Sequence, residues 1–294
     1  MAQTATATKG AVESSLLVRI DHGAVPVNDG GRAWSFYTEV LGAKLHRISH
    51  MDNQRFVGQG PLLFIELAGH KGCGLALEYE NLPPPEGTFD CPVWAFRVSP
   101  ETLQRAPEVL AQRGVTATPV AGPEFSPIAQ SLFFRDTEGN SLELCVPRTP
   151  ATEPAAPESG GALHLEEISH LRFTVTDVDE AERFYTDVLG LALIGRSSDG
   201  SELVYGLKNG EQFIFLHKGP RSSPRSKYIH GPHVALECSE QDYHLIRSRL
   251  DNKYVEYYWG RNNRTPVWHE SMDFTVYFYD PDGNRLQVQM PRAH

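Results

Sequence analysis

The sequence predicts an α+β protein of two tandem domains, each made of paired βαβββ modules that form a curved, cup-like mixed sheet with helices outside. Two observations carry this prediction. The segment SFYTEVLGAKLHRIS (35–49) returns as RFYTDVLGLALIGRS (183–197), and RDTEGNSLEL (135–144) returns as YDPDGNRLQV (279–288). Strand and helix signals also alternate within each copy. A repeat of this length indicates duplicated domains, because solenoid repeats have periods of about 20–50 residues.

The repeat sets the expected domain boundaries. Residues 18–148 form the first domain and residues 163–294 the second. Between them, residues 149–162 are rich in Pro, Ala and Gly without hydrophobic periodicity, which is typical of a linker. Residues 1–17 have no apolar core and are expected to be a disordered tail.

Composition narrows the class of protein. The chain has 294 residues and a formal net charge of −10, with no basic run, so a nucleic-acid partner is not expected. Neither a signal peptide nor a transmembrane segment is recognisable. The four cysteines (Cys73, Cys91, Cys145 and Cys238) are scattered, as expected for isolated thiols in a reducing cytoplasm. We therefore expect a cytoplasmic protein that forms a homo-oligomer and has no membrane partner.

Helix signals are clearest in the second copy. Asp179 can cap a helix whose apolar residues fall on one stripe, ending at Leu189. Gly190 then suits a left-handed position after the helix. A further helix is predicted around residues 240–250.

Strand alternation predicts which side chains share a face. In ISHLRFTV, Leu171, Phe173 and Val175 should pack under helices while His170 points the other way. The same alternation assigns His233, Gln287 and Tyr277 to polar faces, whereas their neighbours in sequence are apolar. A sheet surface that collects imidazoles, an amide and a phenol is either exposed to solvent or the lining of a cup.

These features together resemble the vicinal oxygen chelate superfamily, which includes glyoxalase I, fosfomycin-resistance proteins and extradiol ring-cleavage dioxygenases. The resemblance covers residues 18–148 and 163–292. The segment VWHESMDFTVYFYDPDGNRLQVQM (267–290) is most similar to two-domain type I extradiol dioxygenases. The residues that match this signature are His269, Val276, Tyr277, Asp280, Pro281 and Gly283. Gln287 stands where the signature has Glu.

The resemblance implies a metal site and its ligands. By position they are His170, His233 and Gln287, with Fe(II) as the expected metal and Mn(II) or another divalent metal as the alternative. A neutral amide in place of a carboxylate is expected to weaken metal binding, and replacing Gln287 by Glu to tighten it.

The resemblance also implies catalytic roles. His217 would act as the acid–base residue, Tyr277 would hydrogen-bond a substrate oxygen, and His269 would help to orient the substrate. The implied substrates are a catechol or related hydroxylated aromatic, acidic ones included, together with O2. The loop 254–270, rich in Tyr, Trp and Arg, is either a cover for such a substrate or an ordinary edge hairpin.

The first half departs from the pattern. His22 and Glu143 occupy the first and last ligand positions, but Val93 replaces the middle His. The resemblance implies a non-catalytic N-terminal domain, and the alternative is a second metal site of His22, Glu78 and Glu143. For the whole chain, a metal-dependent lyase or isomerase of glyoxalase type and a non-catalytic binder of small aromatic molecules remain alternatives to the dioxygenase.

Overall fold

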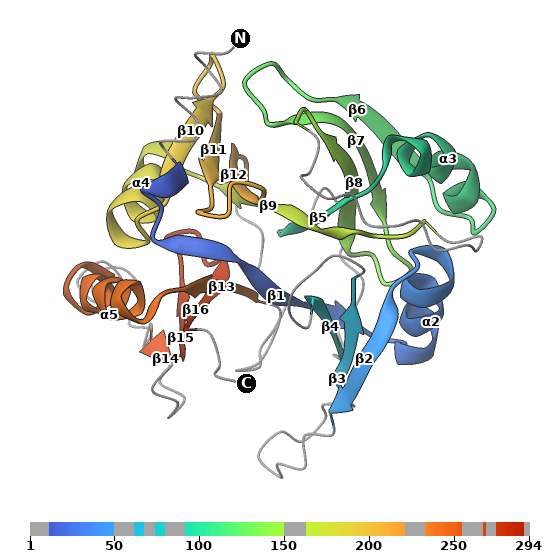
Figure 1. Cartoon of the computed structure of the whole chain (residues 1–294), viewed down its shortest axis with the longest axis horizontal. Helices are drawn as coiled ribbons and strands as arrows, with labels where there is room; N and C mark the ends of the chain where they lie inside the picture. The colour runs from blue at the N-terminus through green and yellow to red at the C-terminus, as the bar shows by residue number, and fades with distance from the viewer. Residues whose placement is uncertain are drawn as a thin grey trace. The chain divides into compact units, whose positions relative to one another are not determined.

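The structure is a computed structural model, which describes residues 12–49, 62–67, 74–79, 92–149, 163–220, 233–254, 267–268 and 275–290 (Figure 1). The chain divides into two compact units. Among the described residues, unit 1 contains 12–21, 172–220, 233–254, 267–268 and 275–290, and unit 2 contains 22–49, 62–67, 74–79, 92–149 and 163–171. Residues 150–162 of the predicted linker and His269 lie outside the described residues.

In the part of the chain that the structure describes, sixteen strands build two eight-stranded mixed sheets. The first sheet has the order β14-β15-β16-β13-β1-β4-β3-β2 and the second the order β10-β11-β12-β9-β5-β8-β7-β6. The strands of the first sheet are β1 (Leu17–Val27), β2 (Lys44–Ser49), β3 (Leu62–Glu66), β4 (Gly74–Tyr79), β13 (Val234–Cys238), β14 (Val267–Trp268), β15 (Thr275–Tyr279) and β16 (Arg285–Gln289). Those of the second are β5 (Val93–Arg97), β6 (Ala117–Ala121), β7 (Ile128–Arg135), β8 (Ser141–Pro147), β9 (Glu167–Val175), β10 (Ala192–Arg196), β11 (Glu202–Gly206) and β12 (Phe213–Lys218).

Each module repeats one pattern of pairing. Its first strand is parallel to its last strand, as in β1 with β4, β5 with β8 and β13 with β16. Neighbouring strands of a sheet that follow each other in the chain pair antiparallel, as in β15 with β16 and β7 with β8. The predicted α+β class with curved mixed sheets is confirmed.

The two halves of the chain share both sheets, which the sequence did not predict. Each sheet takes four strands from each half of the chain, whereas the sequence suggested that the two modules of one half share a sheet. The strands β1 and β9 make this possible, because each begins in one unit and ends in the other. Leu17–Asp21 of β1 is part of unit 1, and Glu167–Leu171 of β9 is part of unit 2.

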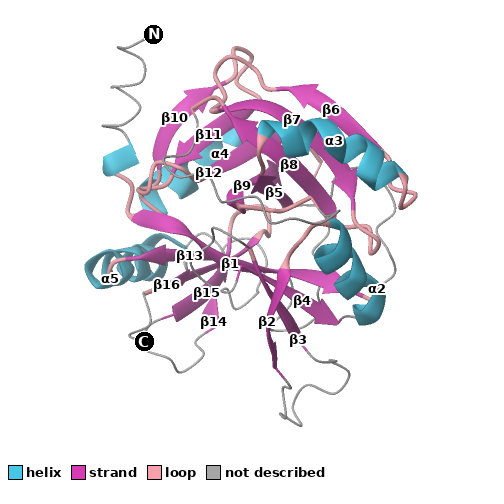
Figure 2. Cartoon of the chain, turned by 45° about the vertical axis from the view of Figure 1, so that its right-hand side comes forward, coloured by secondary structure: helices cyan, strands magenta, loops and turns pink. Residues whose placement is uncertain are grey.

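Helices cover one face of the strands (Figure 2). In unit 2, α3 (Pro100–Ala111) packs on β6, β7 and β8, and α2 (Gly30–Ser35) continues into a π-helix, η1 (Phe36–Val40). In unit 1, α4 (Val178–Arg183) packs on β11 and β12 and continues into η2 (Phe184–Val188). The α5 helix (Glu240–Arg249), with η3 (Leu250–Tyr254), confirms the prediction for residues 240–250. No helix of the described residues is long and apolar enough to cross a membrane.

The caps of α4 correct one prediction and confirm another. The N-cap is Asp177 rather than Asp179, because the Asp177 side chain accepts from the backbone N–H of Glu180. Asp179 lies in the first turn, where its negative charge interacts favourably with the helix dipole. Gly190 has φ +66°, so it takes the predicted left-handed position after the helix.

The repeated FYT and D-x-x-G-N motifs are tied to each other by the same hydrogen bonds in both units. In unit 1 the Tyr185 hydroxyl donates to Asp280 at 2.9 Å, and Asn284 donates to the same carboxylate through its side chain at 2.7 Å. The backbone N–H groups of Asp282 and Asn284 donate to its other oxygen. In unit 2, Tyr37, Asp136 and Asn140 form the same contacts.

These two carboxylates are fully buried, and burial raises the pKa of Asp280 to about 6 and raises that of Asp136 as well. The hydrogen bonds that they accept act in the opposite direction, because they favour the charged form. The Asp–Tyr pairs therefore hold the turn before β16 in unit 1, and the turn before β8 in unit 2, against a π-helix. Part of the extradiol-like signature, Asp280 and Gly283, is thus structural in this chain.

The segment before β1 is packed into unit 1. Val12 is buried, and a Cβ added at Gly206 would lie 2.2 Å from its side chain. The backbone N–H of Leu16 donates to the carbonyl of Gly190, and that of Lys208 donates to Leu17. Residues 12–17, assigned to a tail from the sequence, are therefore part of the folded unit.

The predicted strand faces agree with the packing. Leu171, Phe173 and Val175 are buried, as are Val276, Phe278, Leu286 and Val288. The polar residues on the opposite faces are buried as well, among them His170, His233 and Gln287. These three polar side chains are therefore buried rather than exposed to solvent.

Removing the Tyr185 hydroxyl tests the tie between helix and turn. We expect Tyr185→Phe to lower the free energy of unfolding by about 1.5–3 kcal/mol, because a hydrogen bond to a buried carboxylate is lost. Urea denaturation measures the difference. Tyr37→Phe makes the same change in unit 2, and unchanged stability in both variants would show that the contact contributes nothing.

Candidate metal-binding groups

Three of the predicted site residues gather in unit 1. Gln287 lies on β16 directly opposite Tyr277 of β15, and its other neighbour is Ala235 of β13. His233 immediately precedes β13, and its ring meets that of Tyr277 edge-on with 5.4 Å between centroids. An imidazole, a phenol and an amide thus lie on neighbouring strands.

The nitrogen of the Gln287 amide is hydrogen-bonded, whereas its oxygen is not bonded to any described residue. Its Nε2 donates to Thr275 Oγ1 and to Gln289 Oε1, both at 2.9 Å. Its Oε1 is buried and has no hydrogen-bond partner among the described residues. A buried acceptor without a partner costs about 1–3 kcal/mol. An amide oxygen is a competent ligand for a divalent cation, so Gln287 fits the metal that the superfamily uses.

The remaining predicted residues of the second half are placed elsewhere or not described. His217 lies near the end of β12, exposed and opposite Glu202 of β11. The described contacts of unit 1 do not join it to His233, Tyr277 or Gln287. His269 and most of the loop 254–270 lie outside the described residues, so the roles given to them stay predictions.

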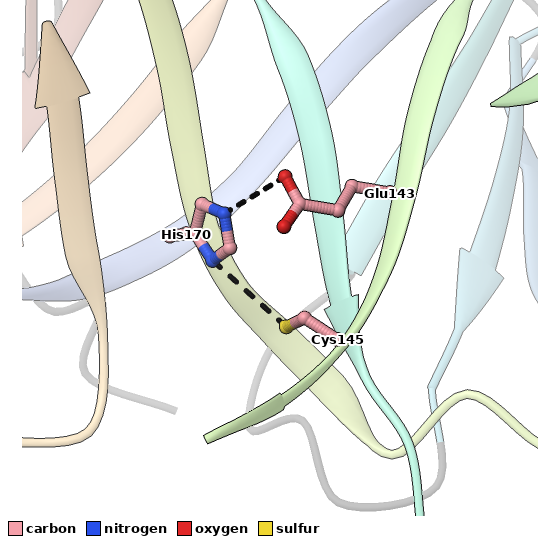
Figure 3. A group of neighbouring side chains, drawn as sticks. All are labelled: Glu143, Cys145 and His170. Atoms are coloured by element: carbon pink, nitrogen blue, oxygen red, sulfur yellow. Dashed lines mark hydrogen bonds and ion pairs between the residues drawn. The ribbon is translucent and has the colours of Figure 1, made fainter. Parts of the chain in front are cut away.

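A second group lies in unit 2, where His170 stands between Glu143 and Cys145 (Figure 3). His170 Nε2 is 3.1 Å from Glu143 Oε2, and His170 Nδ1 is 3.9 Å from Cys145 Sγ. All three side chains are completely buried. One ligand atom from each lies within 4.8 Å of the others, so the group could hold a metal ion.

The group in unit 2 is also satisfied without a metal. Both ring nitrogens of His170 have protein partners, since Nδ1 additionally lies 3.2 Å from Ser169 Oγ. The second oxygen of Glu143 accepts from Ser131. Glu143 and Cys145 share a face because they are two residues apart on β8. Cys145 was predicted to be an isolated thiol, although its spacing from Glu143 on one strand indicates that the two side chains lie on the same face.

Glu143 and Gln287 occupy equivalent positions in the two units. Glu143 pairs with Ala95 and Phe133, and Gln287 pairs with Ala235 and Tyr277. A hydroxyl two residues along the neighbouring strand contacts each of them, Ser131 for Glu143 and Thr275 for Gln287. The frame is therefore the same, but both Glu143 oxygens are engaged, whereas the Gln287 oxygen is open.

The predicted metal set is distributed over both units. His233 and Gln287 belong to unit 1, and His170 belongs to unit 2, where it contacts Glu143 and Cys145. A joint role for all three therefore stays a prediction.

The alternative second site is spread along its strands. His22 pairs with Gly74, and Glu78 pairs with Pro26, four residues farther along parallel strands. Four residues span about 13 Å along a strand, and the second metal site stays a prediction.

Residues 19–144 and 167–288 match the Glyoxalase/Bleomycin resistance protein/Dioxygenase superfamily. The two matches cover most of the chain, so the protein belongs to this superfamily, whose members are mostly metal-dependent enzymes. This confirms the resemblance read from the repeat.

Individual relatives are more distant. Glutathione transferase FosA of Serratia marcescens is 26% identical over 127 residues, covering 43% of this chain and 82% of the transferase. Metallothiol transferase FosB of Staphylococcus epidermidis is 26% identical over 129 residues, with coverages of 43% and 82%.

Two solved structures share the fold over nearly the full chain. Glyoxalase I from Zea mays has a TM-score of 0.60 and 18% identity, covering 92% of each chain. A Bacillus subtilis protein named as a candidate dioxygenase has a TM-score of 0.65 and 17% identity, covering 95% of this chain and 87% of its own. At these identities the likeness shows the fold alone.

The buried pair in unit 2 generates a stability prediction. With EDTA present, Glu143→Leu should lower the free energy of unfolding by about 3–5 kcal/mol, because it leaves His170 buried without its carboxylate partner. Adding His170→Leu should recover part of this loss, since both polar groups are then absent. Urea denaturation of the single and double variants measures the recovery, with Glu202→Leu as a control at a half-buried carboxylate. A double variant less stable than Glu143→Leu would contradict the expectation.

Proposed function

We propose that the protein is a metal-dependent extradiol-type dioxygenase that acts on a catechol or related hydroxylated aromatic, with its metal bound in unit 1 by His233 and Gln287. The observation that supports it most is the buried Gln287 Oε1, an acceptor left open beside an imidazole and a phenol. His170 is the third ligand expected from the sequence, and the experiment below includes it.

The donor set suits Fe(II), with Mn(II) as the alternative, because imidazole and amide oxygen are ligands that both ions accept. When bound, such a metal would supply the redox chemistry that joins O2 to the ring. Since His233 and Gln287 are both neutral ligands, they leave the charge of the ion uncompensated. That charge favours an anionic substrate such as an acidic catechol.

The protein's own groups bind and orient the substrate and move its protons. Tyr277, in contact with the His233 ring, is positioned to donate its phenolic proton in a hydrogen bond to a substrate oxygen. Arg285, whose guanidinium carbon lies 5.5 Å from the Tyr277 ring centroid, adds positive charge nearby. Proton transfer is assigned to His217, because neutral imidazole can accept and return a proton near pH 7.

A second candidate is an oxygen-independent reaction, a lyase, isomerase or thiol transfer in which the metal acts as a Lewis acid. Two observations favour it. His217 is exposed at the end of β12 and has no described contact with His233, Tyr277 or Gln287. The relatives of 26% identity are also named as thiol transferases. A non-catalytic binder of aromatic molecules is the third candidate.

The metal assignment is tested on protein purified anaerobically and loaded with Fe(II). We expect about one metal ion per chain, and its loss in His233→Ala and in Gln287→Leu, because each removes a ligand atom. Elemental analysis measures the content, with the exposed His244→Ala as control. Loss of metal in His170→Ala would add His170 to the ligands, and full metal in both His233→Ala and Gln287→Leu would refute the site.

The reaction is tested by oxygen uptake on a panel of neutral and acidic catechols. His217→Phe should keep its metal and lower kcat by roughly 10²–10⁴-fold, the usual contribution of general acid–base catalysis. Metal-replete protein that consumes no oxygen with any catechol would overturn the dioxygenase and leave the oxygen-independent candidates.

A further inference from the structure

We propose that Asp21 and Gln289 are positioning residues that fix the Gln287 amide with its oxygen, rather than its nitrogen, turned toward the metal. This inference rests on the proposed metal site in unit 1. It adds that a carboxylate on the first strand, 268 residues away in the chain from the amide it contacts, controls which atom the site presents.

The contacts form a continuous chain within unit 1. Arg19 donates to Asp21 Oδ1 at 2.7 Å, and Gln289 Nε2 donates to Asp21 Oδ2 at 2.8 Å. Gln287 Nε2 then donates to Gln289 Oε1 at 2.9 Å. Asp21, Gln287 and Gln289 are all buried, so water does not compete freely for these bonds.

The direction of this chain is set at Asp21. A carboxylate offers only acceptor atoms, so Gln289 must turn its nitrogen toward it. The Gln289 oxygen then faces Gln287, so Gln287 must turn its nitrogen toward Gln289 to donate a hydrogen bond. Its oxygen is left pointing away from both partners. If Gln289 were reversed, the opposite end of Gln287 would be presented.

Thr275 reinforces the same orientation. Its hydroxyl donates to the carbonyl of Val288 at 3.4 Å and accepts from Gln287 Nε2 at 2.9 Å. A hydroxyl could serve either end of an amide, since it both donates and accepts. Asp21 and Gln289 therefore remove the ambiguity that Thr275 alone would leave.

Aligned hydrogen bonds also polarise one another. The negative charge of Asp21 draws the N–H groups of Gln289, and through them those of Gln287, so the Gln287 oxygen becomes a better ligand. Arg19 is shared between Asp21 and Glu237, each at 2.7 Å, which holds the Asp21 carboxylate in place. In this way a neutral ligand is strengthened by a carboxylate that does not reach the metal.

The same arrangement changes the expected effect of a carboxylate at position 287. Replacing Gln287 by Glu would set a carboxylate oxygen against Gln289 Oε1, because Asp21 keeps Gln289 from turning. Two acceptors would then face each other in a buried place. A change at Asp21 that lets Gln289 turn should relieve this conflict.

The test is a cycle of variants titrated with Mn²⁺ alone, by calorimetry and by the loss of the free-ion electron paramagnetic resonance signal. Asp21→Asn should weaken Mn²⁺ binding about 10- to 100-fold, the usual effect of losing a residue that orients a metal ligand. In the Gln287→Glu background the same change should not weaken binding and should tighten it, since a carboxylate has no wrong end to present.

A second variant and a control guard against loss of structure. Gln289→Met interrupts the chain but leaves the contact of Arg19 with Asp21, and it should behave as Asp21→Asn does in both backgrounds. Glu237→Gln removes the negative charge of the other Arg19 partner and leaves the hydrogen bonds from Asp21 to Gln287 intact, so its Mn²⁺ affinity should stay near that of the wild type. Thermal unfolding without metal accompanies each titration.

Different results would refute the positioning role of Asp21 and Gln289 and the metal site itself. Wild-type affinity in both Asp21→Asn and Gln289→Met, or equal weakening in the wild-type and Gln287→Glu backgrounds, would overturn the positioning role. Gln287→Leu, which leaves Asp21 and Gln289 unchanged, tests the metal site itself. Full Mn²⁺ binding in that variant would refute the proposed site.

Discussion

The register of β8 and of β16 is the constraint on which the candidate sites depend. Side chains alternate along a strand, so a slip of one residue would replace Gln287 and Gln289 on the lining by Leu286 and Val288. The turn anchored by Asp280 prevents that slip, since its carboxylate receives two backbone N–H groups, the Asn284 amide and the Tyr185 hydroxyl. Asp136 does the same before Glu143.

Glu143 and Gln287 are buried at equivalent positions of the two units, but their hydrogen bonds differ. In unit 2 the carboxylate of Glu143 is fully matched by Ser131 and His170, and Cys145 faces the other side of the imidazole. In unit 1 the Gln287 amide donates to Thr275 and to Gln289, while its oxygen has no hydrogen-bond partner among the described residues. A cluster whose polar groups are all hydrogen-bonded stabilises a core. A buried acceptor without a partner destabilises the folded protein, and a ligand that binds this acceptor can offset that loss.

The sequence predicted the superfamily, the α+β class and the strand faces because each rests on local patterns that the repeat displays twice. It missed the N-cap by two residues, since Asp177 and Asp179 are both good caps and only the backbone distinguishes them. The partners of His170 and of Gln287 could not be read from it. Glu143 meets His170 through the pairing of modules, and Asp21 meets Gln289 across 268 residues, and neither contact has a local signature.

The exchange of first strands has a consequence for how the two halves of the chain could exist apart. A fragment of residues 163–294 would carry all six residues that the sequence assigns to metal or catalysis: His170, His217, His233, His269, Tyr277 and Gln287. It would still lack Arg19 and Asp21, as well as the Ile20 backbone N–H that donates to Gln212. Because β1 and β9 each begin in one unit and end in the other, neither half of the chain alone contains all the residues of one unit.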